Sequence, residues 1–184
     1  MKEIKEKLVY LKSFKRFFYL NFLVFIISFL IGFFFPVMEK EFLEIIKEFL
    51  EIFEGKNFFE TFLLLFFNNS RISLLAIFLG IFLGFIPMLI LFFNGYLAGF
   101  VFRFVSKEKS FFEIWKFFPH GVFELPAFFI SCALGLNLGI ILIKEFSFKK
   151  TIEELEKALK VFVLIIIPLL LIAALIETIL IFLI

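Results

Sequence analysis

The segment ISLLAIFLGIFLGFIPMLILFFNGYLAGFVF, residues 72–102, decides the fold because it runs for 31 residues without a charged side chain. One bilayer crossing needs about 20 helical residues, so this length exceeds one crossing and falls short of two full ones. Gly84 and Pro87 near its centre are a natural place for one helix to end and another to begin. We therefore favour a tight hairpin of two short spans over a single long, kinked helix.

The composition excludes an ordinary water-soluble fold. The chain has 184 residues, 63% of them hydrophobic, and a mean hydropathy of +1.12, whereas soluble domains are nearer half apolar. A net charge of +2 is too small to indicate nucleic-acid binding. The single cysteine, Cys132, excludes an internal disulfide framework and a cysteine metal cluster. The absence of Asp and Gln and the excess of Lys over Arg favour a thermophile, although an AT-biased genome produces a similar bias.

The remaining charge-free gaps complete an all-α fold. We predict one polytopic transmembrane helix bundle of about five spans over residues 1–184, with one interfacial amphipathic helix after the first span. Four spans would result if residues 72–102 crossed only once. The predicted spans are 17–38, 71–86, 88–105, 118–143 and 161–183. Asn68-Asn69-Ser70 is expected to cap the second of these spans, which begins near Arg71.

The basic residues predict the orientation in the cell membrane. A Lys-rich start precedes the first span, which places the N-terminus in the cytoplasm by the positive-inside rule. With five spans, eleven basic residues lie inside and eight outside, which weakly favours this arrangement. We therefore expect a multi-pass protein of the cell membrane.

The predicted amphipathic helix covers residues 40–54. Glu41, Glu44, Glu48 and Glu51 form one stripe, with apolar side chains on the other face. The stripe argues against docking on anionic lipid. It is either a solvated face above a buried one or a surface that binds a partner.

Glycine pairs predict how the spans pack. Gly80 with Gly84, Gly95 with Gly99 and Gly135 with Gly139 each follow the Gly-x-x-x-Gly pattern. This spacing places both glycines on one helix face and permits close backbone approach. We favour packing within the chain, and a homodimer seam at one pair is the alternative.

Five polar residues fall where lipid is expected. His120 and Glu124 lie one helical turn apart, Glu177 stands alone in the last span, and Asn94 and Asn69 complete the set. An ionisable group in hydrocarbon must be paired, neutralised or in contact with water. Three interpretations remain open: a structural network between helices, a proton or cation pathway, and an intramembrane catalytic or metal site.

The sequence around His120 favours a broken helix. Pro119 suits the first turn of a helix, and Pro126 is expected to break or kink that helix soon afterwards. Asn94 is expected to form a hydrogen bond to another helix. The chain lacks His-Glu-x-x-His, a phosphate loop, a dinucleotide fingerprint and a nucleophile elbow. We therefore assign no catalytic residue, no metal and no cofactor at this stage.

The run Phe118-Pro119-His120-Gly121-Val122-Phe123-Glu124-Leu125-Pro126-Ala127 resembles the signature of the stage II sporulation protein M family of integral membrane proteins. Asn68-Asn69, Asn94-Gly95 and Ile176-Glu177 follow the family's pattern in the same order. The resemblance covers roughly residues 14–184 and favours five spans. It implies a membrane subunit that assembles with cell-wall-remodelling partners in spore formers, while relatives occur widely in prokaryotes that form no spores.

These observations predict a non-enzymatic scaffold or subunit of a membrane complex. Its expected partners are the lipid bilayer and either another membrane protein or a second copy of the chain, with no nucleic acid. The alternative is a small permease or proton or cation pathway that uses the His and Glu residues of the spans.

Overall fold

Helices make up every regular element in the part of the chain that the structure describes. This computed structural model describes residues 14–37, 39–108 and 118–183. In chain order the elements are α2 (Lys15–Phe34), α3 (Glu39–Glu51), α4 (Phe58–Phe78), the 3-10 turn η1 (Leu79–Ile81), α5 (Phe85–Glu108), α7 (Phe118–Glu145), α8 (Phe148–Val161), the π turn η3 (Phe162–Ile166) and α9 (Ile167–Phe182).

Five helices among the described residues are long and apolar enough to cross a membrane, which confirms the predicted all-α fold with five spans. They cover Lys15–Phe34, Phe58–Ile81, Phe85–Lys107, Pro119–Glu145 and Phe148–Phe182. The chain is therefore a multi-pass membrane protein. Of the basic residues expected to fix its orientation, Lys2, Lys5, Lys7 and Lys12 lie outside the described residues, whereas Lys15 and Arg16 begin α2.

The start predicted for the second span was wrong. Helix α4 begins at Phe58, 13 residues before Arg71, and Asn68 to Ser70 lie inside it. The cap is Asn57, whose side chain accepts from the Glu60 N–H at 3.0 Å while the Glu60 carboxylate accepts from the Asn57 N–H at 2.9 Å. A capping box satisfies two backbone donors at once and therefore fixes the helix start. Arg71 is exposed on the surface of α4, and its long apolar stem can lie along the helix.

The chain reversal predicted within residues 72–102 is confirmed, but the two short spans expected there were wrong, because the first arm extends back to Phe58 and the spans cover Phe58–Ile81 and Phe85–Lys107. Helix α4 tightens into η1, and the chain reverses through Leu83 and Gly84, whose φ angles are 57° and 72°. Positive φ favours glycine, which explains Gly84 at this position. Pro87 lies in the first turn of α5, where its missing N–H costs no helical hydrogen bond.

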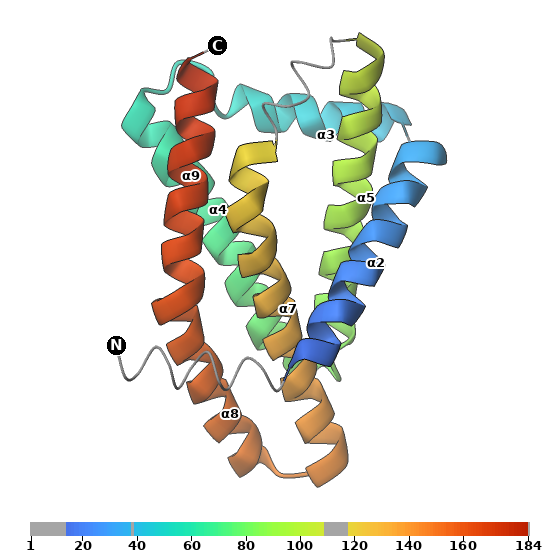
Figure 1. The fold of residues 1–184 in the computed structure, drawn as a ribbon, viewed down its shortest axis with the longest axis vertical. Helices are drawn as coiled ribbons and strands as arrows, with labels where there is room; N and C mark the ends of the chain where they lie inside the picture. The colour runs from blue at the N-terminus through green and yellow to red at the C-terminus, as the bar shows by residue number, and fades with distance from the viewer. Residues whose placement is uncertain (1–13, 38, 109–117, 184) are drawn as a thin grey trace.

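The amphipathic helix is also present, as α3, close to the predicted 40–54. Its apolar side packs through Phe42, whose ring centroid lies 5.3 Å from Tyr96 and 5.6 Å from Phe100 on α5. The glutamates of the predicted stripe, Glu41, Glu44, Glu48 and Glu51, are exposed. Figure 1 shows α3 crossing the bundle near the end where α5 finishes.

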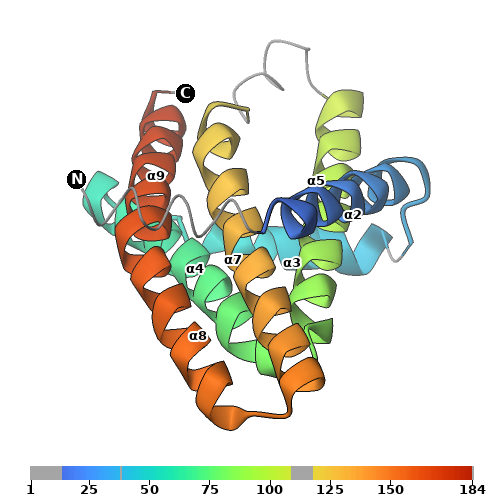
Figure 2. The same cartoon turned by 60° about the horizontal axis from the view of Figure 1, so that its bottom comes forward.

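The spanning helices form two groups. Helix α2 pairs mainly with α5, while α7 contacts α4 and α9 (Figure 1). Figure 2 shows α8, η3 and α9 running as one continuous helix beside α7. The π turn η3 comes just before Pro168, which stands in the first turn of α9 and lacks a backbone donor.

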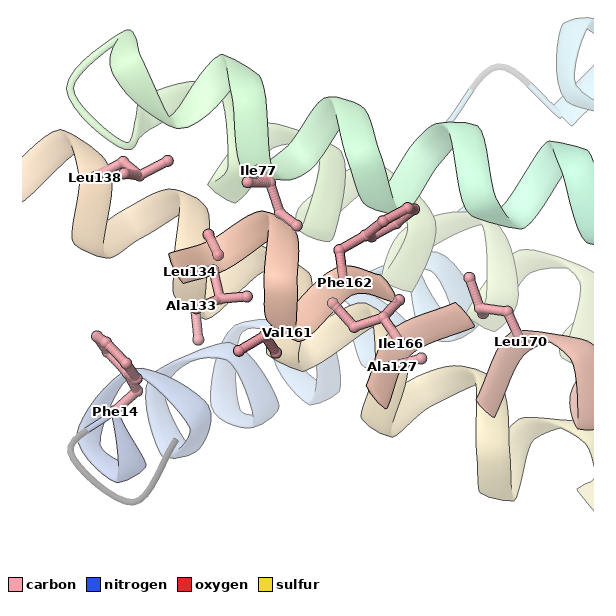
Figure 3. Packing of buried hydrophobic residues seen from close by; sticks show 11 residues of the cluster. Phe14, Ile77, Ala127, Ala133, Leu134, Leu138, Val161, Phe162, Ile166 and Leu170 are labelled. Carbon is pink, nitrogen blue, oxygen red and sulfur yellow. The ribbon is translucent and has the colours of Figure 1, made fainter. Parts of the chain in front are cut away.

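The larger apolar core joins α4, α7 and the α8–α9 helix. Ile77 of α4 and Leu134 of α7 pack with Val161, Ile166 and Leu170, all of them buried (Figure 3). A second cluster, which includes Phe25, Leu91 and Phe129, joins α2, α5 and α7. Helix α7 therefore contributes to both cores and links the two groups.

The glycine faces are filled by helices of the same chain. A Cβ added to Gly80 would meet the backbone of Gly135, and one added to Gly139 would meet the backbone at Gly84. The other pair lies against α2, because a Cβ on Gly99 would meet the Phe29 carbonyl and one on Gly95 would meet Ser28. The expectation that Gly80 and Gly84 share one helix face was wrong, because Gly80 lies in η1 and Gly84 in the turn that follows it. All three glycine pairs nevertheless contact helices of the same chain, so they are not free to form a dimer seam in this conformation.

We predict that Gly99→Ala and Gly135→Ala each lower the free energy of unfolding by about 1–3 kcal/mol, the usual cost of overpacking. The added methyl would meet a backbone carbonyl, of Phe29 or Ala76, which cannot move without separating two helices. Gly121→Ala is the matched control, because nothing lies within 4 Å of its Cβ. Unfolding followed by circular dichroism in one detergent measures all three variants. Equal stability across them would refute backbone contact as the basis of the packing.

Candidate functional site: a polar cluster between α7 and α9

Helix α7 presents His120 and Glu124 on one face. The helix begins at Phe118, so Pro119 lies in its first turn, as predicted, and His120 and Glu124 follow one turn apart. The predicted break at Pro126 was wrong, because α7 continues through it to Glu145. Pro126 removes only the hydrogen bond to the Val122 carbonyl, and the rest of a 28-residue helix maintains the geometry.

Helix α9 brings Glu177 to the same place. One ligand atom each from His120, Glu124 and Glu177 lies within 4.8 Å of the others, and all three residues are half-buried. We call these three residues the polar cluster. Glu177 is more than 50 positions away from His120 and Glu124 in the sequence. The packing of α9 against α7 therefore creates the polar cluster.

The polar cluster lies near one end of the bundle. His120 is the third residue of α7, and Glu177 is five residues before Phe182, the last residue of α9. At the same end, the rings of Phe58 at the start of α4 and Phe182 are 5.6 Å apart. The cluster therefore lies at the end of the bundle where α7 begins and α9 finishes (Figure 1).

The polar cluster has few compensating partners. The Nδ1 atom of His120 is buried and has no hydrogen-bond partner. Within the described residues, the ion pairs are Lys150 with Glu145 and Lys157 with Glu154, neither of which involves the cluster. Two carboxylates held near each other away from water repel unless a proton or a cation intervenes.

The other polar residues of the predicted set bond elsewhere. The Asn94 side-chain amide donates to the Ile90 carbonyl at 2.8 Å, one turn earlier in its own helix. The prediction that Asn94 bonds to another helix was therefore wrong, because its side chain bonds within α5. Asn69 accepts from the neighbouring Asn68 amide at 3.4 Å. A polar side chain in a helix reaches the preceding turn at little cost, so neither residue needs the polar cluster.

The structure also reveals polar links that the sequence analysis missed. Asn21 is fully buried in α2 and donates to the Phe129 carbonyl of α7 at 3.0 Å. Arg103 of α5 donates to the Phe33 carbonyl at 2.8 Å, near the end of α2. Tyr96 Oη accepts from the Val37 N–H at 2.6 Å and donates to the Val37 carbonyl at 2.9 Å. The sequence did contain a signal for the Asn21 bond, because an amide side chain inside an otherwise apolar span is expected to bond to another helix.

The fold and its polar cluster define a class: a polytopic α-helical membrane protein whose titratable groups meet between spans near one end. The family model described as Stage II sporulation protein M matches residues 14–180, and the chain belongs to this family. The match includes the whole of the polar cluster and confirms the resemblance seen in the sequence. No curated protein and no solved structure matches significantly.

We predict that a short bifunctional thiol reagent bridges His120→Cys to Glu177→Cys, in a chain whose buried Cys132 is replaced by alanine. A protease site inserted at the exposed Phe146, between α7 and α8, makes the bridge visible, because the two fragments then stay together on a denaturing gel. Close approach of the two positions is the reason for this expectation.

The matched control pairs Val122→Cys with Glu177→Cys. Val122 is exposed and lies two residues from His120, which turns it to a different face of α7. Equal bridging of the two pairs would contradict the described orientation of α7 toward α9.

Proposed function

We propose that this protein is a non-enzymatic integral membrane protein that acts as a scaffold or subunit of a membrane complex. The observation that carries the proposal is the placement of α3, which packs on α5 through Phe42 and turns its glutamates outward. Membership of the stage II sporulation protein M family agrees with a membrane protein of this kind.

The exposed face of α3 favours a basic partner. Glu41, Glu44, Glu48 and Glu51 form one stripe at the membrane boundary, where it repels anionic lipid headgroups. A partner segment rich in Lys or Arg would be attracted to that stripe and oriented by it. Phe42 packs α3 on α5, so a partner bound to α3 would lie beside α5.

The orientation that accompanies this proposal has the N-terminus in the cytoplasm. Lys15 and Arg16 at the start of α2 and Lys144 at the end of α7 are then on the inner side. Helix α3 and the polar cluster are on the outer side. The complex therefore forms on the outer face of the membrane.

We predict that Glu44→Gln combined with Glu48→Gln lowers partner capture by roughly three- to tenfold, as loss of two exposed charge contacts at about 0.3–0.7 kcal/mol each implies. Photo-crosslinking from α3 in native membranes measures the capture. Glu153→Gln with Glu156→Gln on α8 is the charge-matched control, because both of these residues are also exposed. An unchanged adduct yield from the α3 variant would refute the role of the stripe. An adduct of twice the chain's mass identifies the partner as a second copy.

The convergence of His120, Glu124 and Glu177 favours a second candidate function, a proton or cation pathway. A carboxylate near one end of the bundle can exchange a proton with water, and a neighbouring carboxylate and imidazole can pass it on. In this case the polar cluster is the entrance to the pathway.

Flux through reconstituted protein tests the second candidate. A pathway predicts that liposomes containing the chain dissipate an imposed proton or cation gradient, and that Glu177→Gln loses this flux because the amide cannot titrate. Liposomes with Glu156→Gln should behave like the wild type. Leakage equal to that of empty liposomes for every ion tried would eliminate the pathway.

A further inference from the structure

We propose that His120, Glu124 and Glu177 form a binding site for a divalent transition-metal ion, best suited to Zn²⁺, which joins α7 to α9 near the end of the bundle where α9 finishes. This inference is independent of the scaffold role of α3 and concerns a different part of the molecule.

The spacing of the donor atoms suits a metal ion. Three points within 4.8 Å of one another fit inside a circle with a radius of roughly 2.8 Å. Zinc binds imidazole nitrogen and carboxylate oxygen at about 2.0–2.2 Å. Each donor atom therefore needs to move by less than about 1 Å to reach a central ion, which small side-chain rotations provide.

The charges of the polar cluster favour a divalent cation. Glu124 and Glu177 bring two negative charges to a half-buried place, and no lysine or arginine of the described residues forms an ion pair with either. One divalent ion neutralises both carboxylates and removes their repulsion. A proton shared between the carboxylates cancels only one of these charges.

The histidine distinguishes this site from an ordinary acidic cluster. Nδ1 of His120 is buried without a hydrogen-bond partner, an arrangement that normally costs free energy. A neutral imidazole is a good ligand for zinc and its neighbours in the transition series, whereas Ca²⁺ and Mg²⁺ prefer oxygen alone. One nitrogen and two oxygens therefore select a transition metal over an alkaline-earth ion.

The position of the site permits exchange of the ion. Three protein ligands leave one tetrahedral position for water, as in zinc sites that are not closed. The cluster lies within two turns of the ends of both helices, so the proposed site takes its ion from that end of the bundle. Once bound, it ties the start of α7 to the end of α9 and resists their separation.

Metal analysis of the full-length chain tests the proposal directly. The protein is purified in detergent through a tag that contains no histidine, and elemental analysis is expected to find about one zinc ion per chain. Protein stripped with a chelator should take up zinc again at a single site. It should also bind Co²⁺ with the visible absorption of a low-coordinate complex, and a tenfold excess of Mn²⁺ should not displace zinc.

Variants separate ligation from general damage to the fold. Glu177→Gln keeps the size of the side chain but is a poor ligand, so zinc content should fall by at least roughly tenfold. Glu177→His restores a donor atom at the same place and should restore zinc. Glu156→Gln on α8 is the control and should keep full zinc content. A chelator should lower the unfolding temperature of the wild type and of Glu156→Gln but leave that of Glu177→Gln unchanged.

Several results would overturn the site. The site is refuted if wild-type protein is metal-free as purified and takes up neither Zn²⁺ nor Co²⁺. This test uses only the wild type, so it holds even if every variant fails to fold. Full zinc content in Glu177→Gln would also refute the site, because the metal would then lie elsewhere. Neither result bears on partner capture by α3, so failure of this site is distinguishable from failure of the scaffold proposal.

Discussion

Contact between helix backbones at small residues is the constraint on which this structure depends. Lipid chains are as apolar as leucine, so burying side chains between spans gains little, and close packing must hold the helices together. Gly99 admits the Phe29 carbonyl of α2, and Gly135 admits the Ala76 carbonyl of α4. Because the second contact sets α4 on α7, it also fixes the surface on which the α8–α9 helix packs.

This packing explains where the polar groups are found. Helix α7 lies between the two helix groups, so its first turns can face α9 while Phe129, farther along, faces α2. The polar cluster forms near the start of α7 and the end of α9. Asn21 and Arg103 instead donate to backbone carbonyls and help to hold α2 in place. Asn94 and Asn69, by contrast, bond within their own helices.

Sequence reasoning succeeded where one local property decides the outcome. The breakers Gly84 and Pro87 were enough to predict that the chain reverses within residues 72–102, although not how long the two arms are. The periodicity of residues 40–54 was enough to predict α3. It failed for the start of α4, because a charge-free gap is a weaker guide than the capping box of Asn57 and Glu60. It also failed at Pro126, because a long, packed helix tolerates the loss of one hydrogen bond.

The sequence by itself determined that the chain lies in a membrane and that it is a member of the stage II sporulation protein M family, and it favoured five spans over four. These properties follow from hydropathy, length and local motifs, which are carried by neighbouring residues. Only the tertiary structure decided that Glu177 meets His120 and Glu124, and that Asn94 and Asn69 bond within α5 and α4. The rotation of one helix against another decides such meetings, and it depends on glycine contacts between residues far apart in the chain.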